Sequence, residues 1–158
     1  NTERLAAMEH CVRLEPENPT CLLDLTMTLV RVNGDMVRAR EMLARARMFA
    51  LAEPIQPFVQ LAEGMILVQE GNGRAAVPLL ESALERSAAL GRVNPLAEQL
   101  NDRTRAYLAL AYEQAGNHAQ AEKYFRQAER RLQLVPSFWD LRDRCYKELR
   151  CLPADEFA

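Results

Sequence analysis

A glycine followed by aspartate or asparagine occurs three times in the chain, at Gly34-Asp35, Gly71-Asn72 and Gly116-Asn117. Glycine readily adopts the positive φ that a tight reversal of the chain requires. The residues five, nine and twelve positions after each glycine are small, large and small in turn: Ala39, Leu43 and Ala46, then Ala76, Leu80 and Ala83, then Ala121, Phe125 and Ala128. Steps of four and three place each set on one face of a helix. The pattern predicts three pairs of closely packed helices joined by glycine turns.

A proline closes each of these three units, at Pro54, Pro95 and Pro136. Proline ends a helix because its ring clashes with the preceding turn and because it has no N–H to donate. The three glycines are separated by 37 and 45 residues, a spacing typical of repeat proteins whose units stack into a solenoid. No segment alternates apolar and polar residues over the length of a strand. The sequence therefore predicts an all-α solenoid.

These features resemble the tetratricopeptide repeat family over nearly the whole chain. The third unit shows the resemblance most clearly, where the family's small and aromatic packing positions are matched by Ala106–Tyr112, Gly116-Asn117, Ala121, Phe125 and Ala128. The middle unit matches the same positions with Gly64, Leu67, Gly71, Ala76, Leu80 and Ala83. Gly64 suits a place where two helices nearly touch. The resemblance implies a right-handed α-solenoid of helix-turn-helix repeats with a capping helix at its C-terminal end.

The boundaries between units predict a single repeat domain over residues 1–158. We expect the second helix of a truncated repeat, three full repeats and a capping helix, over 1–18, 19–54, 55–95, 96–136 and 137–152. Arg4 stands where the repeat pattern places alanine. The alternative for 137–152, where Ser137 and Asp140 can cap a helix start, is the first helix of a fourth repeat. Because the sequence begins within a repeat, we expect it to be a fragment of a longer protein.

Composition and charge argue against several functional classes. The 158-residue chain is 49% hydrophobic and 27% charged and has a formal net charge of −2, without the basic excess of a nucleic-acid-binding protein. No uncharged apolar run approaches the ~20 residues that cross a bilayer, so we expect no membrane insertion. The spacing of Cys11, Cys21, Cys145 and Cys151 fits neither a metal site nor a dense disulfide framework. We expect reduced thiols and a cytoplasmic location.

The sequence offers little for catalysis. His10 is turned away from Cys11 by the helical register, and His118 falls in a turn, so neither histidine has a partner for acid–base chemistry. The segment Glu70–Arg74 contains two glycines but lacks the lysine of a phosphate-binding loop. Two carboxylate–arginine pairs at helical spacing are predicted to stabilise solvated helix faces: Glu41 with Arg45, and Glu122 with Arg126. We therefore expect no enzymatic activity, no cofactor and no metal.

The resemblance assigns partner binding to the first helix of each unit, which lines the concave face of tetratricopeptide folds. The candidate residues are mostly apolar: Leu23, Met27, Val30, Phe58, Leu61, Met65, Val68, Arg103, Tyr107, Leu110 and Gln114. Leucine, methionine and valine replace the basic and amide residues with which some family members grip a chaperone's C-terminal carboxylate, so we expect no such clamp. Flexible methionines suit an amphipathic helix or a hydrophobic peptide as the ligand.

Two other interpretations of these positions stay open. Residues such as Met27, Met65 and Leu110 can instead pack in the core or against parts of a longer protein. The apolar surface can also pair with a second copy of the chain, which would make the protein a structural, homo-oligomeric module. The prediction common to the partner-binding and self-association interpretations is a non-catalytic protein–protein interaction module.

Overall fold

The computed structural model describes residues 2–32, 34–91 and 95–132. These residues form helices and no strands: α1 (Thr2–Leu14), α2 (Pro19–Val32), α3 (Met36–Phe49), the short 3-10 helix η1 (Glu53–Ile55), α4 (Gln56–Gln69), α5 (Gly73–Gly91), α6 (Pro95–Gln114) and α7 (His118–Leu132). The predicted all-α class is confirmed. The predicted capping helix over 137–152 lies outside the described residues.

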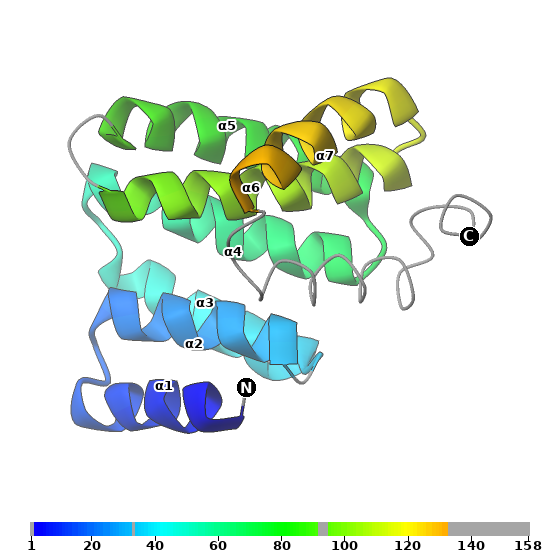
Figure 1. Ribbon diagram of the computed structural model, residues 1–158. Coiled ribbons are helices and arrows are strands. Elements are labelled where there is room, and N and C mark those ends of the chain that lie inside the picture. The colour runs from blue at the N-terminus through cyan, green and yellow to red at the C-terminus, as the bar shows by residue number, and fades with distance from the viewer. Residues whose placement is uncertain (1, 33, 92–94, 133–158) are drawn as a thin grey trace.

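The helices stack in chain order, with α1 at one end of the array and α5, α6 and α7 at the other (Figure 1). Each helix packs against the next one along the chain, and α4 also packs against both α2 and α6. We call α2, α4 and α6 the inner helices because they contact one another as well as their neighbours in sequence. The arrangement is the predicted solenoid of helix-turn-helix units.

The three Gly-Asx pairs each reverse the chain and start the next helix. Gly34, Gly71 and Gly116 have φ values of 61°, 81° and 84°, a region that other residues rarely adopt. The side chain that follows each glycine then caps a helix, since Asp35 Oδ1 accepts a hydrogen bond from the Arg38 amide at 3.1 Å. Asn72 and Asn117 accept equivalent bonds from the amides three residues further on. One dipeptide therefore specifies both the turn and the N-terminus of the helix that follows it.

Small residues let the paired helices approach closely. The six alanines of the repeated pattern are at most 1% exposed: Ala39, Ala46, Ala76, Ala83, Ala121 and Ala128. The predicted close approach at Gly64 is confirmed, because a Cβ placed there would lie 2.4 Å from Leu80 Cδ2. At Gly73 a Cβ would lie 2.4 Å from the backbone oxygen of Ala111, which ties the start of α5 to α6. Helix spacing in this fold is thus set by residues that lack a bulky side chain.

A disulfide joins α1 to α2 and corrects the prediction of four reduced thiols. Cys11 and Cys21 are bonded, with their Cα atoms 5.7 Å apart. The chain reverses between them at Glu15–Asn18, so residues ten positions apart face each other across two helices. Spacing along the sequence does not reveal such a pairing, because it depends on how two helices are packed. Cys145 and Cys151 lie outside the described residues.

The disulfide is a covalent attachment of α1, in which Val12, at 9% exposed, is the only buried residue. We expect that replacing Cys11 and Cys21 by serine lowers the free energy of unfolding by about 2–3 kcal/mol, because the bond closes a short loop in the unfolded chain. Urea unfolding with and without reductant measures the change. A Cys145→Ser/Cys151→Ser variant, which keeps the bond, should respond to reductant as the wild type does. Equal stability of the oxidised and reduced wild type would contradict the prediction.

Candidate functional site

The predicted partner-binding residues all lie on the inner helices, as expected. All of them except Phe58, Arg103 and Gln114 are buried: Leu23, Met27 and Val30 on α2, Leu61, Met65 and Val68 on α4, and Tyr107 and Leu110 on α6. These buried residues belong to one hydrophobic core that also contains Ala39, Ala46 and Ala76 of the repeated pattern. What the structure shows for them is core packing. Their role as direct contacts for a partner stays a prediction.

Gln114 also has a packing role. Its Nε2 donates to the backbone oxygen of Val68 at 2.9 Å, near the end of α4. Its Cβ lies close to Gly73, at the start of α5. Gln114 therefore holds the end of α6 against the turn between α4 and α5. Phe58 is half-buried and packs against the core. Arg103 is the one charged residue among the predicted partner-binding residues.

Arg103 lies in a charged cluster that joins α1, α2 and α6. Its Nη1 is 3.9 Å from the sulfur of Met27. Burial lowers the pKa of Arg103 to about 10, and repulsion from Arg31 and Arg4 acts in the same direction, against Tyr107 and Asp24. We call Arg4, Asp24, Arg31 and Arg103 the arginine cluster.

Asp24 is the carboxylate of the arginine cluster. Burial raises the pKa of Asp24, while the nearby positive charges of Arg4 and Arg103 oppose that rise. Arg4 and Arg103 therefore lie near a carboxylate that is itself costly to ionise, and Arg31 lies near Arg103. Such a site favours an additional negative charge, which would relieve the repulsion among the arginines.

Sequence reasoning identified Arg103 but missed the other three members of the arginine cluster. Arg4 and Arg103 are far apart in the sequence and come together only because the helix stack brings α6 towards α1 and α2. One signal was present in the sequence, since Arg4 breaks the small-residue pattern of its half-repeat. A charged residue at a packing position indicates a polar environment in the fold.

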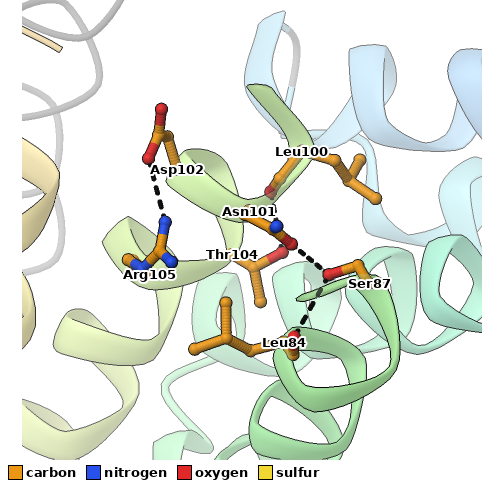
Figure 2. Close-up of polar contacts among 7 residues, drawn as sticks. All are labelled: Leu84, Ser87, Leu100, Asn101, Asp102, Thr104 and Arg105. Carbon is orange, nitrogen blue, oxygen red and sulfur yellow. Dashed lines mark hydrogen bonds and ion pairs between the residues drawn. The ribbon is translucent and has the colours of Figure 1, made fainter. Parts of the chain in front are cut away.

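A second polar group lies between α5 and α6, where its members bond to each other. Figure 2 shows the Ser87 hydroxyl between the Asn101 side chain and the backbone oxygen of Leu84. Thr104 Oγ1 donates to the backbone oxygen of Leu100 at 2.8 Å, which satisfies this buried hydroxyl within its own helix. These contacts fix the position of α6 on α5. What the structure shows for them is a packing contact between the two helices.

The remaining titratable candidates lie at the surface. His118, predicted in a turn, is instead the exposed first residue of α7, and its Nδ1 lies 2.7 Å from Oε1 of Glu113 near the end of α6. His10 is exposed on α1. No group of three or more potential metal ligands occurs within the described ranges. The predicted pair of Glu122 with Arg126 is confirmed.

The predicted pair of Glu41 with Arg45 is wrong. Arg45 Nη2 instead donates to the backbone oxygen of Pro16 at 3.1 Å. The packing of α3 against the turn between α1 and α2 thus overrides the local preference for a four-residue ion pair.

Comparison with protein families matches residues 99–131 to the tetratricopeptide repeat. The matched segment covers most of α6 and α7, the unit in which the sequence pattern is clearest. Searches among curated proteins and among solved structures found no match for the chain. The resemblance to the tetratricopeptide repeat family is confirmed on this unit, and such repeats indicate a protein–protein interaction module.

We predict that Met65→Glu lowers the free energy of unfolding by about 3–5 kcal/mol, because it removes a core side chain and buries a charge. The matched control is Leu14→Glu at the C-terminal end of α1, where the leucine is 69% exposed and the same change should cost at most about 0.5 kcal/mol. Urea unfolding followed by circular dichroism measures both. A Met65→Glu protein as stable as the control would contradict core packing and favour an open groove.

Proposed function

We propose that the chain is a non-catalytic protein–protein interaction module and that the inner helices bind an amphipathic helix or peptide from a partner protein. The match of α6 and α7 to a tetratricopeptide repeat supports the general class. The observation that supports the site is the arginine cluster, which joins α1 to the largely apolar inner helices α2 and α6. A group of arginines beside an apolar wall favours a ligand that carries both acidic and apolar groups.

The chemistry of the proposed ligand follows from Phe58 and Arg103, the two half-buried predicted residues that do not hydrogen-bond to the backbone of a neighbouring helix as Gln114 does. Phe58 offers an aromatic surface, and Arg103 offers a guanidinium group. An aspartate or glutamate next to an apolar side chain in the ligand would satisfy both, since charge-assisted hydrogen bonds to carboxylates are strong. The buried apolar residues of α2 and α4 would support this surface from beneath.

The location of the protein stays a prediction. None of the helices in the described ranges combines the length and the apolar character needed to cross a membrane. The Cys11–Cys21 disulfide argues against the predicted cytoplasmic location, because disulfides persist chiefly in oxidising compartments.

Selection from a displayed library of random peptides tests the proposed binding site directly, because the library supplies the ligands and no natural partner has to be identified first. We expect the wild-type chain to select peptides that pair an acidic with an apolar residue. We also expect Arg103→Gln to weaken their binding by about tenfold or more, the loss typical of one charge-assisted hydrogen bond. The control is Arg126→Gln on α7, whose arginine is exposed and pairs only with Glu122 among the described residues. Circular dichroism establishes that both variants are folded.

Two results would contradict the proposal. Selected peptides that bind wild type and Arg103→Gln equally would exclude the arginine cluster as the recognition site. Failure to select any peptide would remove the support for a peptide-binding face and would favour the alternative function, self-association. A separate observation, the exposed apolar face of α3, supports that alternative.

A further inference from the structure

The outward face of α3 carries an uncovered apolar stripe. Val37, Glu41, Ala44 and Met48 follow one another at intervals of four, three and four residues, and all four are exposed. Val37 is 83% exposed, Met48 is 69% exposed, and Leu51, just beyond the end of the helix, is 82% exposed. We call these five residues the α3 seam. Alternating steps of four and three are the spacing with which one helix packs along another.

The arginines beside the seam each make a contact within the chain. On the side of α1, Arg38 pairs with Glu9 at 2.7 Å, and Arg45 donates to the backbone of Pro16. On the side of α4, the arginines at positions 40 and 47 form ion pairs with the glutamates at positions 70 and 63. These bonds fix the guanidinium groups along both edges and leave the apolar seam between them open.

Glu41 is the one acidic residue of the seam. It makes no ion pair or hydrogen bond within the part of the chain that the structure describes. Its neighbours on α3 are mainly arginines, yet each of those is bonded elsewhere. A carboxylate in the middle of an apolar stripe favours a docked surface that brings a positive charge to the same place.

We propose that the α3 seam is a twofold interface with a second copy of this chain. Two α3 helices that pack antiparallel about Ala44 place residues at equal distances before and after Ala44 opposite each other. Glu41 and Arg47 each lie three residues from Ala44, so Glu41 faces Arg47 of the partner subunit. Val37 lies seven residues before Ala44, so it faces the C-terminal end of the partner's α3, where Met48 and Leu51 are exposed. The small Ala44 side chain at the axis allows the two helices to approach closely.

The charge pattern selects a second copy as the occupant. Each chain supplies one carboxylate and one guanidinium at positions related by the twofold axis, so one interface contains the same ion pair twice. The partly exposed Arg47 side chain, at 47%, can contact a second carboxylate while it keeps Glu63. The interface lies on α3, away from the arginine cluster, so it does not depend on the proposed function and can fail separately from it.

Sedimentation equilibrium over a range of concentrations tests this interface on the full chain. The wild type should move from the mass of one chain to the mass of two. Met48→Glu and Glu41→Arg should each raise the dissociation constant by about tenfold or more, a factor that corresponds to 1.4 kcal/mol. Exchange of the two charges in Glu41→Arg/Arg47→Glu should restore association. Glu85→Arg, an exposed reversal on α5, is the control and should leave the constant unchanged.

Cysteine cross-linking in a Cys145→Ser/Cys151→Ser background tests the position of the axis. Ala44→Cys should form a cross-linked dimer under mild oxidation. Val37→Cys alone should not, because two copies of position 37 would be separated by about 21 Å along the helices, beyond the reach of a disulfide.

The proposal would be overturned by a protein that stays monomeric at every concentration, which would leave the seam to a different partner. A dimer that Met48→Glu does not weaken would also overturn it, because the contact would then lie elsewhere. Cross-linking of Val37→Cys to itself, or no cross-linking of Ala44→Cys, would exclude the antiparallel arrangement. Circular dichroism and urea unfolding show that each variant is folded.

Discussion

Close contact between neighbouring helices at small residues is the constraint on which the rest of this fold depends. The repeated alanines at the helix crossings have essentially no exposed surface, and Gly64 and Gly73 face atoms that a Cβ would overlap. With larger residues at these points the helices would separate, and the core would lose its density. In each unit a glycine turn joins the two helices, and the residue after the glycine caps the second helix. Local sequence and packing thus specify the same arrangement.

This packing changes the role of the inner helices. α4 contacts both α2 and α6 in addition to its neighbours in sequence, so its apolar residues are covered from several sides. Leu61, Met65 and Val68 are fully buried as a result. Met27 on α2 approaches Arg103 on α6, so the first and third units also meet. The surfaces that we propose for partners are the arginine cluster and the outward face of α3.

The sequence was sufficient to predict features that depend on neighbours within one unit. The three turns, the small-large-small stripes and the close approach at Gly64 all follow from helical periodicity and from the conformational freedom of glycine. Features that depend on contacts between units were missed or left open. The Cys11–Cys21 disulfide requires two helices to pack in one register, and the arginine cluster requires α6 to reach α1 and α2. The burial of Met65 requires both neighbours of α4 to be in place, which periodicity along one helix cannot reveal.

Native-state hydrogen exchange tests most directly the claim that the inner helices are the stable centre of the protein. The account predicts that the slowest-exchanging amides lie in α2, α4 and the described buried part of α6, because these helices contain most of the buried core. It also predicts faster exchange in α1, where only Val12 is buried. The slowest exchange in α1 or α7, or equal protection in all helices, would contradict a core built on the inner helices.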